Sequence, residues 1–67
     1  MMIVELKKEN GNRIFVEAYE VNESNDKIVV YPQDPVSMHP KRKYKKNNYK
    51  YIKIKNPSGQ DSFLKEE

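Results

Sequence analysis

The sequence contains no cysteine, no tryptophan and only two glycines. Without cysteine the chain can form no disulfide and offers no thiolate ligands for a structural zinc ion. Small secreted domains usually compensate for a thin core with disulfides, so their absence favours a reducing, cytoplasmic location. The two glycines, Gly11 and Gly59, are far apart, which excludes a glycine-rich phosphate-binding loop.

Long apolar runs are also lacking. No segment approaches the roughly 20 apolar residues that a membrane-spanning helix needs. The apolar run within residues 1–8 is too short for a secretion signal, and its charges stand on the wrong side. The sequence therefore predicts no membrane partner.

Catalytic residue types are scarce. His39 is the only histidine, and a nucleophilic site needs histidine, a serine or cysteine, and an orienting acid that converge in space. Ser37 is near His39 in sequence, but such proximity does not produce that geometry. Glu17 and Glu20 would point to opposite faces of a strand, so they do not form an acid–base pair. We expect no enzyme activity, no cofactor and no metal site.

The chain has 67 residues, which is enough for one small domain. A domain of this size buries only about 60% of the surface of its unfolded chain, so its core is thin. The apolar residues are mostly isoleucine, valine, tyrosine and phenylalanine, which favour strands.

Turn residues bound five predicted strands, at residues 1–8, 13–21, 27–31, 49–55 and 61–65. Apolar and polar residues alternate in the first, second and fourth of them, whereas residues 27–31 are a continuous apolar run, which suggests that both faces are partly covered. Prolines 32, 35 and 40 disfavour a helix, and predict a long irregular basic loop over residues 32–48. The expected fold is all-β, a single domain over residues 1–67. It is either a small five-stranded SH3-like, partly open barrel or a strongly bent antiparallel sheet. An OB-type barrel ranks second, because it normally needs more residues.

The first two strands are predicted to form a hairpin with a three-residue loop, Asn10-Gly11-Asn12. This loop would pair Leu6 with Val16 and Val4 with Ala18. A two-residue loop would instead place Val4 opposite Glu17, which sorts apolar from polar side chains less well. In the three-residue-loop register Phe15 and Tyr19 fall on the other face of the second strand.

The segment KRKYKKNNYKYIKIK, residues 41–55, is the strongest anomaly. It holds eight of the 13 basic residues and no acid, whereas the remainder holds five basic and ten acidic residues. Such segregation creates a local field that attracts a polyanion or an acidic surface. The candidate contact residues are the cations and tyrosines of this segment, namely Lys41, Arg42, Lys43, Tyr44, Lys45, Lys46, Tyr49, Lys50, Tyr51, Lys53 and Lys55.

The segment divides into two parts. Residues 41–46 are expected to be mobile loop cations. In the strand at residues 49–55, Ile52 and Ile54 would anchor one face together with Lys50. The opposite face would then carry Tyr49, Tyr51, Lys53 and Lys55.

Interleaved tyrosine and lysine on one strand face are typical of proteins that bind single-stranded nucleic acid, because bases stack on the rings and phosphates meet the cations. Lysine outnumbers arginine eleven to two, which predicts non-specific contact with DNA or RNA rather than reading of base edges. The alternative without a binding function is that the lysines are solvated and protect a sheet edge, while the tyrosines fill a thin core.

A second functional hypothesis is a small protein-binding regulator or inhibitor, encoded by a phage or mobile element, that docks its basic face on an acidic partner surface. Free sheet edges could also pair with a second copy, so a homodimer is a further expectation.

Overall fold

The computed structural model describes residues 2–32 and 41–66, and seven strands lie within these ranges. In chain order the elements are β1 (Met2–Lys8), β2 (Arg13–Ala18), β3 (Glu20–Glu23), β4 (Lys27–Tyr31), β5 (Arg42–Lys45), a short 3-10 helix η1 (Lys46–Asn48), β6 (Tyr49–Lys55) and β7 (Asp61–Lys65). The predicted all-β class is confirmed, although five strands was an undercount. No helix in the described ranges is long and apolar enough to cross a membrane.

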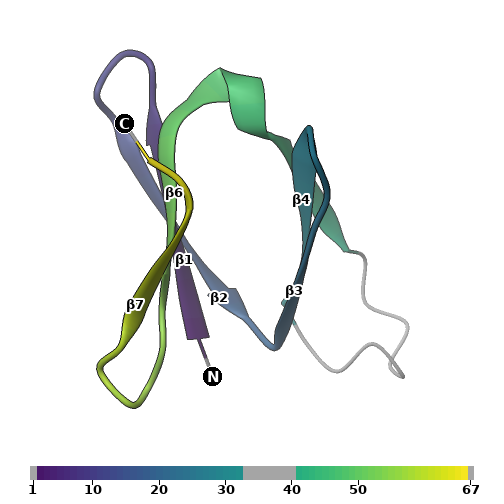
Figure 1. Cartoon of the computed structure of the whole chain (residues 1–67), viewed down its shortest axis with the longest axis vertical. Coiled ribbons are helices and arrows are strands. Elements are labelled where there is room, and N and C mark those ends of the chain that lie inside the picture. The colour runs from purple at the N-terminus through teal and green to yellow at the C-terminus, as the bar shows by residue number, and fades with distance from the viewer. Residues whose placement is uncertain (1, 33–40, 67) are drawn as a thin grey trace.

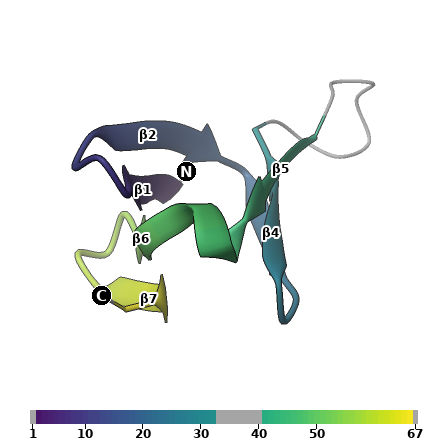
Figure 2. The ribbon, with the colours of Figure 1, turned by 90° about the horizontal axis from the view of Figure 1, so that it is seen from above.

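The strands form two antiparallel sheets. One has four strands in the order β2-β1-β6-β7, and the other has three in the order β3-β4-β5. Figures 1 and 2 show them as two separate layers, linked by the step from β2 to β3 and by η1 between β5 and β6. The described strands form no closed barrel.

The core lies between the two sheets. Because side chains alternate along each strand, one face of every strand can turn inward while the other stays at the surface. Seven apolar side chains in the described ranges are buried in this way, Val4, Leu6, Val16, Ala18, Ile28, Val30 and Ile52. Both sheets contribute to the cluster, so each sheet leaves its other face outside.

The predicted second strand, residues 13–21, is broken in the structure. β2 ends at Ala18 and β3 begins at Glu20, and the chain passes from one sheet to the other at Tyr19. The Tyr19 N–H donates to the carbonyl oxygen of Tyr31 at 2.8 Å, which ties this bend to the end of β4. The sequence carries no glycine or proline between residues 13 and 21. The alternation of apolar and polar residues therefore gave no sign that the strand ends at Ala18.

The prediction of an irregular loop through residue 48 is wrong for its second half. Residues 33–40 lie outside the described ranges, but Arg42–Lys45 form β5, and Lys46–Asn48 form η1. In the β4–β5 ladder Tyr44 lies opposite the buried Ile28, while Lys43 and Lys45 point to the other face. A strand with one inward tyrosine among cations lacks the apolar signal that usually identifies a strand.

The β1–β2 hairpin adopts neither of the two registers considered. Val4 lies opposite Val16 and Leu6 opposite Ile14, although the predicted core face of the hairpin is correct. The Gly11 N–H donates to the Lys8 carbonyl at 3.0 Å, and Gly11 has φ +92°. The three loop residues are therefore 9–11, one position earlier than predicted. A left-handed glycine in the third loop position allows this turn.

We predict that Gly11→Ala lowers the free energy of unfolding by about 1–2 kcal/mol, because the left-handed backbone is strained for a residue with a Cβ. A Cβ at this position would meet no atom within 4 Å, so the cost comes from the backbone alone. Gly11→Asn should recover much of the loss, because asparagine tolerates this conformation. Urea denaturation of the three proteins measures the effect, and equal stability of the alanine and asparagine variants would contradict it.

Candidate functional site

The basic segment is divided between the two sheets. Lys41 precedes β5, which carries Arg42, Lys43 and Lys45, and these four cations are exposed. Tyr51, Lys53 and Lys55 lie on β6 in the other sheet. The structure therefore places the two predicted parts of the segment on different sheets, one part mainly cationic and the other partly aromatic.

Two of the predicted contact tyrosines pack inward. Tyr44 and Tyr49 are half-buried against the core, and their rings meet edge to face with centroids 6.0 Å apart. Burial raises the pKa of the Tyr49 hydroxyl, and Tyr44 raises it further. These rings link the two sheets across η1, so packing accounts for their position.

The prediction that Tyr49 shares a face with Tyr51 is wrong, because β6 carries a bulge. Lys7 lies opposite Tyr51, but its neighbour Lys8 lies opposite Tyr49, so Lys50 is an extra residue without a place in the register. One extra residue reverses the alternation, and side chains before it switch faces. Tyr49 consequently joins the core instead of the outer face.

Lys46 is engaged within the chain. Its Nζ lies 2.6 Å from Oε2 of Glu23, in an ion pair that links η1 to the end of β3. A lysine outside the basic segment also secures this corner, because Lys65 Nζ donates to the carbonyl oxygens of Lys46 and Tyr49 at 2.7 and 2.6 Å. Both lysines therefore have a clear structural use.

The outer face of the four-stranded sheet gathers rings and lysines from all four strands. We call it the aromatic–lysine face, and define it as Lys7, Phe15, Tyr51, Lys53, Lys55 and Phe63. Phe15 is 58% exposed and Phe63 is 50% exposed, which is unusual for phenylalanine. Tyr51 and Phe63 meet edge to face with centroids 6.2 Å apart.

Each ring of this face lies under a lysine. The ammonium nitrogen is 5.8 Å from the ring centroid for Lys7 and Tyr51, 5.8 Å for Lys53 and Phe63, and 5.9 Å for Lys55 and Phe15. These distances allow cation–π attraction. The rings and cations are thus held in alternation across the sheet.

Glu5 lies at the centre of the aromatic–lysine face and is only 2% exposed. Its Oε2 accepts a hydrogen bond from the Tyr51 hydroxyl. Its Oε1 lies 3.3 Å from Lys55 Nζ and 3.9 Å from Lys53 Nζ. A buried carboxylate is costly unless it is paired and hydrogen-bonded, and here three side chains of β6 supply those partners.

These contacts hold the pKa of Glu5 below its ordinary value of 4.5. The hydrogen bond from Tyr51 is the largest cause, and Lys55 and Lys53 lower the pKa further, against burial, which raises it. The carboxylate is therefore charged at neutral pH. It fixes Tyr51, Lys53 and Lys55 in one arrangement.

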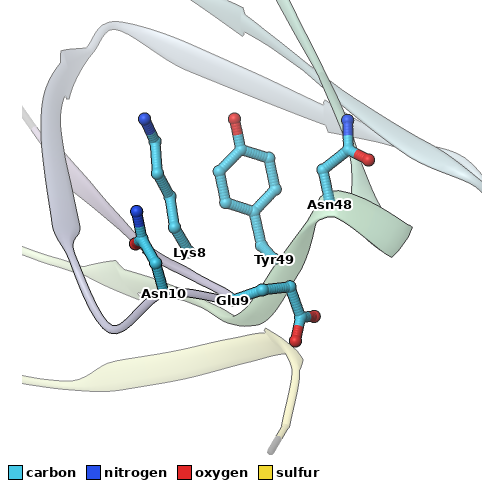
Figure 3. Close-up of a pocket in the computed structure, with 5 residues that line it drawn as sticks. All are labelled: Lys8, Glu9, Asn10, Asn48 and Tyr49. Atoms are coloured by element: carbon cyan, nitrogen blue, oxygen red, sulfur yellow. The ribbon is translucent and has the colours of Figure 1, made fainter.

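Two shallow hollows adjoin the sheet. One, of about 390 Å³, is lined by Tyr51, Lys53, Phe63 and Glu66 and belongs to the aromatic–lysine face. The other, of about 460 Å³, lies at the η1 end and is lined by Lys8, Glu9, Asn10, Asn48 and Tyr49. In Figure 3 the Glu9 side chain points away from the side toward which the other four project. The second hollow is polar and open, and we assign it no function.

Glu5 and three residues of the aromatic–lysine face were not among the contact residues predicted from the sequence. Glu5, Lys7, Phe15 and Phe63 lie outside the basic segment, and only their strand pairings bring them beside β6. The alternation of the second strand did place Phe15 on the outer face. On β7 Leu64 packs against the core, whereas Phe63 is half exposed.

No protein-family model matches the chain, and neither a curated protein nor a solved structure matches it. Among residues 2–32 and 41–66, no three histidine, cysteine, aspartate or glutamate side chains gather closely enough to hold a metal ion. The arrangement of the site is therefore the basis for any functional inference.

We predict that Glu5→Gln lowers the free energy of unfolding at neutral pH by about 1.5–3 kcal/mol, because it removes the charge from the hydrogen bond with Tyr51. The pKa of Glu5 is depressed in the folded state, so its stabilisation is complete above pH 4.5 and is lost as the pH falls through the folded pKa. The difference between wild type and variant should therefore shrink in acid.

Denaturant unfolding of both proteins across this pH range measures the difference. Glu17→Gln is the matched control, because Glu17 is an exposed carboxylate on β2 of the same sheet. A difference that stays constant with pH, or a control that behaves like Glu5→Gln, would show that the Glu5 charge does not organise this face.

Proposed function

We propose that the chain binds single-stranded nucleic acid on the aromatic–lysine face. The observation that carries the proposal is that three rings, two of them at least half exposed, each lie within 6 Å of a lysine ammonium. Unpaired bases would stack on Phe15, Tyr51 and Phe63, while the lysines would neutralise the adjacent phosphates. Such stacking contributes about 1–3 kcal/mol per base and accepts every base type.

The internal contacts of the face favour binding because they reduce the entropy that would be lost on association. Tyr51, Lys53 and Lys55 are already oriented by Glu5, and ordering a free side chain costs about 0.5–1.5 kcal/mol. The hollow between Tyr51 and Phe63 gives a base an approach to both rings. The proposal includes no catalytic step.

Binding would be largely independent of sequence. Bidentate recognition of base edges in nucleic acids usually relies on arginine, asparagine or glutamine. The aromatic–lysine face offers lysines, which act as point charges. Its rings and cations suit any single strand, whether DNA or RNA.

We also infer that the fold is an SH3-like, partly open barrel. Its five strands would be β1, β2 continued by β3, β4, β5 and β6, with β7 added at the outer edge. The bend at Tyr19 and the short η1 before β6 support this assignment, because they carry the chain between the two sheets. Fold alone does not give function, so the nucleic-acid proposal rests on the face and not on the barrel.

A second candidate is a protein partner, and a specific observation favours it. Glu5 and Asp61 are ion-paired with the lysines of β6, so the aromatic–lysine face is less cationic than its lysine content implies. Half-exposed Phe15 and Phe63, with Ile3 39% exposed, would suit the apolar centre of a protein interface. In this case the regulator or inhibitor hypothesis applies, with docking on an acidic protein or on a second copy.

We predict that Phe15→Ala and Phe63→Ala each weaken binding to a labelled oligothymidylate by about 1–3 kcal/mol, because each removes one stacking ring. Tyr19→Ala is the matched control, since Tyr19 is 54% exposed but lies at the bend between the sheets. Fluorescence anisotropy measures the affinity, and thermal unfolding checks that the exposed rings can be removed without loss of the fold.

Unchanged affinity in both phenylalanine variants, or equal loss in the Tyr19 control, would rule out stacking on this face. If the wild-type chain binds no oligonucleotide at low salt, the protein-partner candidate replaces the proposal.

A further inference from the structure

The outer face of the three-stranded sheet is a second cationic surface. Ile28 and Val30 of β4 point into the core, so Lys27 and Val29 point outward, and Lys45 and Lys43 lie opposite them on β5. We call Lys27, Lys43 and Lys45 the lysine face. It shares no residue with the aromatic–lysine face and lies on the other sheet.

Lys27 and Lys45 form a pair that is unfavourable for the isolated chain. They are direct cross-strand partners, and like charges in this position destabilise a sheet. No ion pair in the described ranges involves Lys27, Lys43 or Lys45. The nearby acids in sequence and register are Glu20 and Glu23 on β3 and Asp26 in the β3–β4 turn. Glu23 is paired with Lys46, and neither of the others is paired with these lysines.

Protection of a sheet edge does not explain this arrangement. Lysines on an edge strand prevent pairing with other sheets, which explains Lys43 and Lys45 on β5. Lys27, however, lies on β4, the central strand of its sheet. Edge protection therefore does not account for Lys27, and an anion bound between or above the two ammonium groups would relieve their repulsion.

We propose that the lysine face binds the phosphate backbone of a nucleic acid, at a site separate from the stacking face. Alternate residues of a strand are about 6.6 Å apart, and neighbouring strands are about 4.8 Å apart. Three lysines are thus gathered over a small area, and β5 is the outermost strand of its sheet among the strands that the structure describes. The inference rests on the proposed function for the identity of the polyanion, and the chain would then hold two nucleic-acid segments at once.

The test uses the full chain with two probes, inorganic polyphosphate, which has no bases, and a labelled oligothymidylate. The variants Lys27→Glu and Lys45→Glu each convert the repulsive pair into an ion pair. We expect each to weaken the binding of both probes, and to lower the salt slope of oligothymidylate affinity by about 0.7 for each phosphate that the variant no longer neutralises. Each variant should also raise Tm by about 2–4 °C, since an opposite-charge pair replaces a like-charge pair.

Lys8→Glu is the control for net charge, because it makes the same charge change at the far end of β1, outside both faces. Equal loss of binding in this control, or unchanged binding in Lys27→Glu and Lys45→Glu, would overturn the lysine face as a site. A lower Tm in both variants would show that the Lys27–Lys45 pair is not repulsive, and would overturn the proposal on that ground.

The two proposals fail in different ways. Loss of polyphosphate binding in Lys27→Glu, with no effect of either Phe15→Ala or Phe63→Ala on oligothymidylate, supports the lysine face and rejects the stacking face. The reverse result rejects the lysine face alone. A wild-type chain that binds neither probe rejects both.

Discussion

A core of only seven buried apolar side chains holds the two sheets together in the described part of the chain, and this constraint shapes the whole molecule. Each sheet can bury one face against the other, and the described strands supply no further layer to cover the outer faces. The outer faces must therefore be made of side chains that tolerate water while still stiffening the sheets. Lysines whose ammonium groups lie close to aromatic rings meet both needs on the four-stranded sheet. The same alternation of rings and lysines would bind bases and phosphates. The proposed function therefore uses side chains that also stabilise this thin fold.

Much of the fold could be predicted from the sequence because local signals were strong. Alternation identified β1 and β6, a continuous apolar run identified β4, and Asn-Gly marked the first turn. Two features had no local signal. The bend at Tyr19 depends on the Tyr31 carbonyl in another strand, and β5 is a strand because β4 offers it a free edge. Long-range pairing decided both, and tertiary context regularly overrides local preference in strands.

The candidate site was harder to predict than the fold. The basic segment is unusual in composition, but the bulge at Lys50 turns Tyr49 inward. No glycine or proline in the sequence indicates that bulge. The partners of β6 on the aromatic–lysine face come from three other strands. From the sequence alone, Glu5 in particular is indistinguishable from an ordinary exposed polar residue of an alternating strand. Its burial follows from its place between Phe15 and Lys53 in the middle of the sheet.

The central claim is that single-stranded nucleic acid contacts the outer face of the four-stranded sheet. Mapping of backbone amide chemical shifts during titration with an oligothymidylate tests it most directly, because every strand reports separately. We predict saturable shifts centred on Tyr51, Lys53 and Phe63, together with Phe15 on β2. Saturable binding that leaves the amides of β6 and β7 unchanged would contradict it.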